Sequence, residues 1–279
     1  EPVATLRAIE KQKVTILFGA PPMYVAWVAT PGADQYDLSS VRLAVSGAAP
    51  LSTDVLKSFH DMFGVDIDEG YGLTETSPTL TSNRMMPKPK PGSVGRALPG
   101  VELRIVNEAG DDVELGDPGE IIVKGPNIFQ GYWKQPEETE RVFTDGWFCT
   151  GDIAVKDEEG YIHLVDRKRD LVIVSGFNVF PSEVEAAMLQ NAKVAEAAVI
   201  GVPHEYRGET LMAYVVLEPG TEATEDELLG DVGKRLARFK CPESIEIVDS
   251  LPHLLTGKVM RRMLRDAGSD QHEAETAPA

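Results

Sequence analysis

The first ninety residues alternate between short apolar runs and segments with helical spacing. The apolar runs at 14–18 and 41–45 have the length of buried strands, and the segment 65–69, which ends at the glycines of 70–72, is the next predicted strand. A helical pattern follows Ser52, a residue type that favours the N-cap position of a helix. Strands and helices joined by tight turns are typical of a parallel sheet with ligand loops at the strand ends. We therefore predict an α/β sheet segment over residues 1–90.

Beyond Pro91 the pattern changes to short strands at hairpin spacing. The segments that alternate apolar and polar positions, or nearly so, are 102–106, 119–124 and 161–165. Turn-forming residues at 107–110 and 156–160 supply connections between such strands. We predict a small β-barrel-like subdomain over residues 91–167.

A third pattern begins after Asp170. It comprises a helix at 181–190, strands at 194–202 and 212–217, and an acidic amphipathic helix at 225–236. These elements indicate a compact α+β unit of about a hundred residues, a viable size for a domain. The predicted fold class is thus α/β plus α+β, with a large domain at 1–167, a small mobile C-terminal domain at 168–266 and an acidic tail at 267–279.

Two further segments have an unusual composition. Residues 14–33 carry no charge over twenty positions, which is the length of a membrane span. Pro21 and Pro22 interrupt this stretch, so a buried strand followed by a helix that begins at the prolines accounts for it better. The Pro-rich segment 85–91 is predicted to be a stiff surface loop.

Composition narrows the class of protein. The chain has 279 residues, a formal charge of −18 and 42% hydrophobic residues, values that fit a soluble globular protein. Nucleic acid is an unfavourable partner, because phosphate binding requires clustered Lys and Arg. Cys149 and Cys241 lie in unrelated segments and give no disulfide framework, which favours a reducing, cytoplasmic location. No signal peptide is visible.

Five motifs carry the chemistry. They are Tyr-Gly-Leu-Thr-Glu-Thr at 71–76, Trp-Phe-Cys-Thr-Gly-Asp at 147–152, Val-Asp-Arg-Lys-Arg-Asp at 165–170, Ser-Gly-Phe-Asn-Val-Phe-Pro at 175–181, and Thr-Gly-Lys-Val-Met-Arg-Arg at 256–262. In this order and at this spacing they resemble the adenylate-forming (AMP-binding) superfamily of acyl-CoA synthetases, peptide-synthetase adenylation domains and luciferases. The motif sequences are most similar to those of bacterial long-chain fatty-acyl-CoA ligases. The resemblance extends from about residue 14 to about residue 266.

The motif at 70–72 places an aromatic ring between two glycines that allow close backbone approach. The resemblance implies that Tyr71, between Gly70 and Gly72, stacks on the adenine of ATP or AMP. The opposite wall of the adenine site would be the turn formed by Gly47, Ala48 and Ala49. Taken alone, Tyr71 would be an ordinary turn tyrosine.

Other residues of the large domain receive roles from the same resemblance. Thr74 would contact the α-phosphate or the acyl carbonyl, and Glu75 would bind Mg²⁺, a hard cation that accepts few carboxylates together with phosphate oxygens. Asp152, which follows a predicted glycine turn, would accept both ribose hydroxyls. Arg167 would contact the ribose and phosphate side, although Asp166 is an alternative partner for it. In isolation, Glu75 and Asp152 would be solvated surface acids.

The resemblance also assigns residues at and beyond the domain boundary. Lys258 would bridge the substrate carboxylate and the α-phosphate during adenylation, a task that suits a hydrated ammonium on a flexible stem. Arg169 would be the hinge of the small domain, and Gly176 would line the channel for the pantetheine of CoA. The arginines that follow Lys258, at 261, 262 and 265, are predicted to form a solvated basic face, with CoA phosphates as the alternative partner.

The expected function is that of an ATP-dependent fatty-acyl-CoA ligase. The Ser/Thr/Gly-rich phosphate loop of such ligases is absent from residues 1–279, so we expect the C-terminal part of a longer enzyme, inactive in isolation. The alternatives are an acyl-AMP ligase or adenylation domain that loads a carrier protein, and a catalytically silent nucleotide-binding fragment. Expected ligands are ATP/AMP, CoA, Mg²⁺ and a fatty acid or other carboxylate. A lipid substrate leaves open a peripheral membrane contact.

Overall fold

The chain divides into two units with a boundary between Leu164 and Val165. The computed structural model describes residues 1–254 and 257–266, so Thr256 and the expected acidic tail at 267–279 lie outside the described residues. The expected boundary, between residues 167 and 168, lies three residues further along the chain. None of the helices within the described ranges is long and apolar enough to cross a bilayer.

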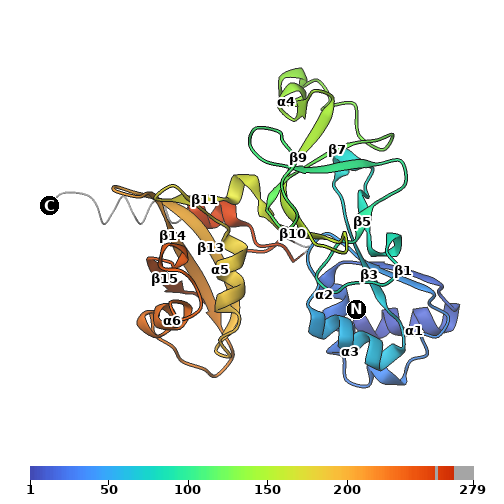
Figure 1. The fold of residues 1–279 in the computed structure, drawn as a ribbon. Helices are drawn as coiled ribbons and strands as arrows, with labels where there is room; N and C mark the ends of the chain where they lie inside the picture. Colours follow the sequence, from blue (N-terminus) through green and yellow to red (C-terminus); the bar gives the residue numbers. More distant parts are fainter. Residues whose placement is uncertain (255–256, 267–279) are drawn as a thin grey trace. The chain divides into compact units, whose positions relative to one another are not determined.

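A five-stranded sheet organises the first ninety-seven residues (Figure 1). Its strands, in spatial order, are β1 (Ile16–Gly19), β2 (Leu43–Ser46), β3 (Ile67–Tyr71), β4 (Thr81–Ser82) and β5 (Arg96–Ala97). The pairs β1–β2 and β2–β3 are parallel, and β4 and β5 continue the sheet in antiparallel pairs. The predicted parallel α/β segment is therefore confirmed.

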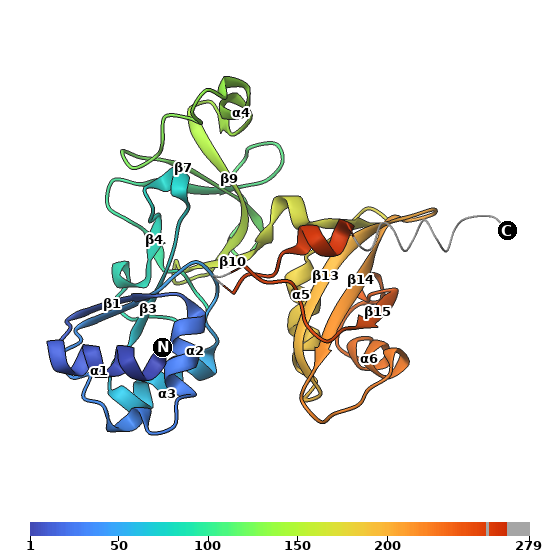
Figure 2. The same cartoon turned by 180° about the vertical axis from the view of Figure 1, so that it is seen from behind.

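Three helices accompany this sheet and build its core. They are α1 (Pro2–Gln12), α2 (Pro21–Val28) and α3 (Thr53–Phe63). They lie along the same side of the sheet in both views (Figures 1 and 2). Tyr24, Trp27 and Phe59 from α2 and α3 are almost fully buried and contact one another edge to face or tilted. Ser52 caps α3 as predicted, because its hydroxyl accepts the Val55 N–H at 3.3 Å.

The second sheet of the first unit is open and does not form the predicted barrel. Its strands are β6 (Glu102–Val106), β7 (Gly119–Lys124), β8 (Phe143–Thr144), β9 (Trp147–Lys156) and β10 (Ile162–Arg167), and a short helix, α4 (Pro136–Arg141), precedes β8. The order is β10-β9-β7-β6, with β8 beside β9. Closure of a barrel requires the two edge strands to pair. Among the described strands β6 and β10 lie at opposite edges, so the predicted β subdomain is present as an open sheet and not as a closed barrel.

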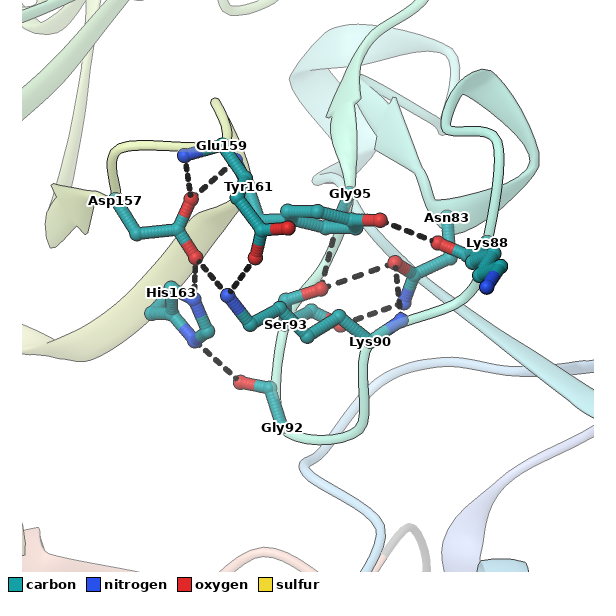
Figure 3. A network of polar contacts seen from close by, with 10 residues as sticks. All are labelled: Asn83, Lys88, Lys90, Gly92, Ser93, Gly95, Asp157, Glu159, Tyr161 and His163. Carbon is teal, nitrogen blue, oxygen red and sulfur yellow. Dashed lines mark hydrogen bonds and ion pairs between the residues drawn. The ribbon is translucent and has the colours of Figure 1, made fainter.

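The Pro-rich segment 85–91 is fixed to this sheet by polar contacts (Figure 3). The Lys90 ammonium donates to Asp157 Oδ2 at 2.6 Å and to Glu159 Oε2 at 2.7 Å. The Tyr161 hydroxyl donates to the carbonyl of Lys88 at 2.6 Å. Asp157 and Glu159 lie in the turn between β9 and β10, so this turn holds a loop that is about seventy residues away in sequence.

A third sheet forms the second unit. Its strands, in chain order, are β11 (Val172–Val174), β12 (Phe177–Val179), β13 (Val194–His204), β14 (Gly208–Leu217) and β15 (Ser244–Ile247), and its helices are α5 (Pro181–Met188) and α6 (Glu225–Val232). The spatial order is β12-β11-β14-β13, with β15 parallel to β14. Val184, Met188 and Leu228 from the helices are buried with strand residues in one core. The predicted α+β unit is confirmed.

Candidate active site

Tyr71 and Asp152, predicted to contact adenine and ribose, are joined by a direct hydrogen bond. The Tyr71 hydroxyl donates to Asp152 Oδ2 at 2.5 Å, across 81 residues of sequence. Tyr71 ends β3, whereas Asp152 lies within β9 of the neighbouring sheet. Asp152 is only 7% exposed, so the carboxylate is held in place by its surroundings. The structure thus brings together two residues that the sequence connected only by resemblance.

A bulge in β9 delivers Asp152 to this position. Three residues of β9, 150–152, face a single residue of β7, two more than a regular ladder contains. Gly151 adopts a φ of 71°, which an L side chain would strain, and its N–H donates to Glu120 Oε1 at 3.1 Å. The glycine turn expected before Asp152 is therefore a bulge inside a long strand, because strand pairing resumes on either side of it.

Glu75, the predicted Mg²⁺ ligand, lies in the 3-10 turn η2 (Thr74–Thr76) together with Thr74. The Tyr132 hydroxyl donates to Glu75 Oε1 at 2.9 Å, and the Phe129 N–H donates to the carbonyl of Glu75 at 2.8 Å. Burial and the bond to Glu75 raise the pKa of Tyr132 to about 12. Sequence reasoning missed Tyr132, although the aromatic-rich run at 129–133 was visible. Thr74 is exposed at the start of the turn.

A buried carboxylate, Glu69, lies beside the predicted adenine turns, and sequence reasoning also missed it. Its oxygens accept the N–H groups of Leu51 at 3.3 Å and Gly92 at 3.4 Å. Burial raises the pKa of Glu69. Glu69 directly precedes Gly70 in β3, and Leu51 follows the turn at 47–49. The carboxylate therefore connects the two turns that the resemblance assigns to opposite sides of adenine.

His163 extends this connection to the β9–β10 turn (Figure 3). Its Nδ1 lies 3.1 Å from the carbonyl of Gly92, and its Nε2 lies 3.0 Å from Asp157 Oδ2. Gly92 is therefore bound through its N–H to Glu69 and through its carbonyl to His163. The segment around Gly92 therefore links the β9–β10 turn to the strand that ends in Tyr71.

The predicted adenine turns contain two constrained backbone positions. Ala48 adopts a φ of 76°, the left-handed region that residues with a side chain rarely occupy. A Cβ added to Gly72 would lie 1.8 Å from the carbonyl oxygen of Pro78, so only glycine fits there. Gly47 donates its N–H to the carbonyl of Gly19 at 3.2 Å. Ala49 and Gly70 are partly buried beside these positions.

In the second unit, the predicted residues lie on separate turns. Arg167 ends β10, and Arg169, with a side chain 73% exposed, lies in the 3-10 turn η4 (Lys168–Asp170). Gly176, at a φ of 85°, is exposed in the turn between β11 and β12. Asp166, the alternative partner of Arg167, accepts backbone N–H groups from Arg167 at 2.8 Å and from Ser182 at 2.9 Å. Asp166 thereby also caps the first turn of α5.

Lys258 is exposed on a closed turn. The Leu254 N–H donates to the carbonyl of Lys258 at 2.8 Å, and the Gly257 N–H donates to the carbonyl of Leu254 at 2.9 Å. Gly257 adopts a φ of 84°. The backbone of Lys258 is thus fixed by hydrogen bonds, while the residue as a whole stays accessible.

The prediction of a solvated basic face after Lys258 is wrong for two of its three arginines. The Arg261 and Arg265 side chains are 22% and 34% exposed, and both contact Asp170. Arg261 also forms an ion pair with Glu185. Acidic partners distant in sequence partly cover these arginines, and the basic pattern alone could not reveal those partners. Arg262 is exposed as predicted.

The described acidic side chains near the predicted site can supply one protein ligand to Mg²⁺, and they do not form a multidentate metal site. Within residues 1–254 and 257–266, no group of three or more His, Cys, Asp or Glu side chains could hold a metal ion. Glu75 retains acceptor sites beyond the one that Tyr132 occupies. Mg²⁺ is commonly bound by one or two carboxylates together with substrate phosphates, and this donor set is compatible with that arrangement.

Two family models match the sequence. The model described as AMP-binding enzyme matches residues 1–133, and the model described as AMP-binding enzyme C-terminal domain matches residues 183–258. Each of these matches lies within one of the two units of the structure.

Known proteins resemble nearly the whole chain. A long-chain-fatty-acid–CoA ligase of Bacillus subtilis (strain 168) is 42% identical over 275 residues, which are 98% of this chain and 49% of the relative. A feruloyl-CoA synthase of Amycolatopsis sp is 41% identical over 95% of this chain and 54% of the relative. The crystal structure of ATP-bound MatB from Rhodopseudomonas palustris has a TM-score of 0.89 at 39% identity, over 98% of this chain and 54% of that chain. The chain spans about half the length of the curated relatives it matches.

Proposed function

Because the chain belongs to the AMP-binding enzyme family, we propose that it provides the nucleotide-binding turns and the lysine-bearing domain of an ATP-dependent acyl-CoA ligase. In this reaction a carboxylate oxygen of the substrate attacks the α-phosphorus of ATP, and pyrophosphate leaves. The CoA thiol then attacks the acyl carbonyl of the adenylate, loses its proton, and AMP leaves. Since the chain covers about half of its relatives, the full reaction is proposed for the full-length protein.

The hydrogen bond between Tyr71 and Asp152 is the observation that carries this proposal. It places a ring and a carboxylate from two different sheets side by side. An aromatic face can stack on adenine, and a carboxylate can accept both hydroxyls of the attached ribose. The Tyr71 hydroxyl uses one acceptor site of the Asp152 carboxylate, so this carboxylate is oriented before the nucleoside binds.

Two further groups act at the reacting phosphate in this proposal. Thr74, exposed at the start of η2, donates its hydroxyl to the α-phosphate or the acyl carbonyl. The Lys258 ammonium neutralises charge that develops on the carboxylate and α-phosphate oxygens. Nucleotidyl transfer depends mainly on positioning and electrostatics, so neither group needs to act as a nucleophile.

Glu75 would hold Mg²⁺, with Tyr132 fixing the orientation of its carboxylate. When bound, the ion supplies charge neutralisation for the phosphates of ATP. CoA is the proposed acyl acceptor, and Gly176, which lacks a side chain at an exposed turn, would allow the pantetheine to pass close to the backbone. A carrier protein is the alternative acceptor.

A fatty acid is the proposed carboxylate, and the cytoplasm the proposed location. The Bacillus subtilis relative supports the fatty acid through its name and its 42% identity. The feruloyl-CoA synthase at 41% identity supports an aromatic acid nearly as well, so an aryl carboxylate is the second candidate.

The test uses the full-length protein with ATP, Mg²⁺ and CoA. Palmitate, ferulate and acetate are offered separately, and the acyl-CoA products are identified by mass spectrometry. We expect palmitoyl-CoA as the main product, together with AMP and pyrophosphate. Feruloyl-CoA as the main product would show that the substrate is an aryl acid and not a fatty acid. Acyl-AMP that accumulates without any thioester would favour the carrier-protein alternative, and the absence of any adenylate would overturn the ligase proposal.

A further inference from the structure

We propose that Arg261 and Glu185 are positioning residues for Lys258: their ion pair docks the lysine-bearing segment onto α5, and Arg261 also contacts Asp170 at the end of the proposed hinge turn. This inference rests on the proposed role of Lys258 in adenylation. It concerns residues that lie wholly within the second unit.

The contact between Arg261 and Glu185 is a two-pronged pair. Arg261 Nη2 lies 2.8 Å from Glu185 Oε1 and 2.7 Å from Oε2, and Nε lies 3.2 Å from Oε1. The two side chains are 22% and 15% exposed. A planar guanidinium that meets both oxygens of one carboxylate fixes direction as well as distance. An exposed lysine in the same place would fix neither.

Glu185 is itself held, so it can serve as a fixed reference point. It projects from α5, and its Oε1 also accepts the Val199 N–H from β13 at 2.8 Å. Burial raises the pKa of Glu185, while Arg261 opposes that shift by favouring the charged carboxylate. The carboxylate is therefore bound to the sheet on one side and to Arg261 on the other. Removal of the arginine would leave a buried acid without its cation.

Asp170 connects the same segment to the proposed hinge. It is the last residue of η4 and is 6% exposed. Arg261 Nη1 lies 3.7 Å from Asp170 Oδ2, and Arg265 Nη2 contacts Asp170 Oδ1. Residues 261–266 are helical, and residues four apart in a helix share a face, so both arginines present their guanidinium groups to one carboxylate. Any rearrangement at η4 that moves Asp170 is thereby transmitted to the segment that carries Lys258.

Arg261 lies three positions after Lys258, and backbone hydrogen bonds make the chain between them stiff. The Met260 N–H donates to the carbonyl of Pro252 at 2.8 Å, and Val259 pairs with His253. Leu264, one turn beyond Arg261, is buried against Tyr214 and Leu251. Because these bonds join residues 252–254 to residues 257–260 as one stiff unit, a shift of Arg261 displaces the whole unit and the lysine backbone with it. Displacement of a catalytic group by about 1 Å can cost roughly a hundredfold in rate.

A purely structural role for the pair makes a different prediction. If Arg261 only stabilised the second unit, its removal would lower every activity of that unit in the same proportion. If it positions Lys258, only the half-reaction that uses Lys258 should fall. The two half-reactions can be measured separately. A pyrophosphate-exchange assay measures adenylation, and an assay that supplies synthetic acyl-adenylate and CoA measures thioester formation.

The experiment compares Arg261→Ala, Arg261→Lys and Glu185→Gln in the full-length enzyme, with Arg262→Ala as the matched control. We expect Arg261→Ala to lower the adenylation kcat about a hundredfold, with the KM for ATP and the thioester half-reaction within about threefold of wild type. Arg261→Lys keeps the positive charge but cannot contact both oxygens of Glu185 as the guanidinium does. Its adenylation kcat should therefore lie between those of Arg261→Ala and the wild type. Arg262→Ala should leave adenylation unchanged, because that side chain is exposed.

Glu185→Gln keeps the side-chain volume and protects the test if Arg261→Ala does not fold. It should reproduce the selective loss in adenylation, at a smaller size. Parallel losses in both half-reactions, or no loss in either, would overturn the positioning role while leaving the ligase proposal intact. A wild-type enzyme without pyrophosphate exchange would instead refute the proposed function, and the positioning role with it.

Discussion

The two units hold their candidate residues in different ways. In the first unit, Tyr71 and Asp152 come from two sheets and contact each other directly, and Glu69 and Tyr132 support the neighbouring turns from buried or half-buried positions. In the second unit, Arg169, Gly176 and Lys258 lie on separate exposed turns, and a half-buried ion pair of Arg261 holds the segment that follows Lys258. The first arrangement suits a site formed before the ligand binds. The second suits a side chain that is delivered to the reaction.

The strongest test of this comparison removes Lys258, the side chain that we propose is delivered to the reaction. Lys258→Ala should lower adenylation roughly 10²–10³-fold, the size expected for loss of one group that stabilises developing charge. Thioester formation from supplied acyl-AMP should be largely unchanged. Pyrophosphate exchange and a thiol-release assay on the full-length enzyme measure the two steps. Equal losses in both would mean that Lys258 has a general binding or folding role.

A second test restricts the backbone of the proposed hinge at Arg169. Arg169→Pro fixes φ near −65° and restricts the preceding residue, so η4 could no longer change its backbone freely. We expect one half-reaction to fall about a hundredfold, as for a misplaced catalytic group, and the other to survive. The same two assays apply, with Arg169→Ala as the control for loss of the charge. If both half-reactions change together, the segment 167–170 is a static turn.

Loss of the hydrogen bond between Tyr71 and Asp152 should change the kinetics of the enzyme less than the two substitutions above. Tyr71→Phe retains the ring but removes the hydroxyl that donates to Asp152, a bond to a charged group worth about 1.5–3 kcal/mol. We expect the KM for ATP to rise about tenfold or more, with a kcat close to wild type. Steady-state kinetics with varied ATP measures both. A kcat that falls while KM holds would show that the hydroxyl acts in the transition state and not in nucleotide binding.

The smallest expected effect concerns Glu69. A raised folded pKa stabilises the protein below the usual carboxyl value of 4.5, and this contribution disappears as the pH rises through the folded pKa. Glu69→Gln keeps an acceptor for the Leu51 or Gly92 N–H without the buried charge. At neutral pH its free energy of unfolding should equal or exceed that of wild type, by about 1 kcal/mol at most.

Glu69→Ala is the matched variant for that test. It removes the acceptor and should lower stability by about 1–3 kcal/mol, because two backbone donors lose their partner. Urea unfolding at pH 4.5 and pH 7 measures both variants. If Glu69→Gln destabilises the protein as much as Glu69→Ala at pH 7, the charge itself is required.

Sequence reasoning located what depends on local pattern and on motifs. The predicted strands 102–106 and 119–124 agree with the bounds of β6 and β7, because alternation is explicit there. Strands β11 and β12 were not predicted, since three-residue strands leave too short a pattern. Alternation predicted the β subdomain but not whether its sheet closes, because closure depends on pairing between strands distant in sequence.

The same division applies to the candidate site. Motifs singled out Tyr71 and Asp152, but their hydrogen bond follows from the placement of two sheets. Glu69 and Tyr132 carry no signal of their own in one sequence, because an acid before a glycine and a tyrosine in an aromatic run occur at ordinary surface and core positions as well. Arg261 looked like a solvated cation, since its partners Glu185 and Asp170 lie 76 and 91 residues earlier. Long-range ion pairs remain invisible until the chain is folded.

The bulge in β9 has a consequence for how this chain can tolerate insertions and deletions. Phe148 and Ala154, on either side of the bulge, belong to the same core, so the extra segment preserves the alternation of faces. Deletion of one residue from 150–152 would exchange inward and outward positions for the rest of the strand. Deletion of two would restore a plain ladder with the faces intact, but Asp152 would lose its approach to Tyr71. Packing of the core therefore allows the number of residues in this segment to change only in steps of two. The contact between Asp152 and Tyr71 allows only the present number.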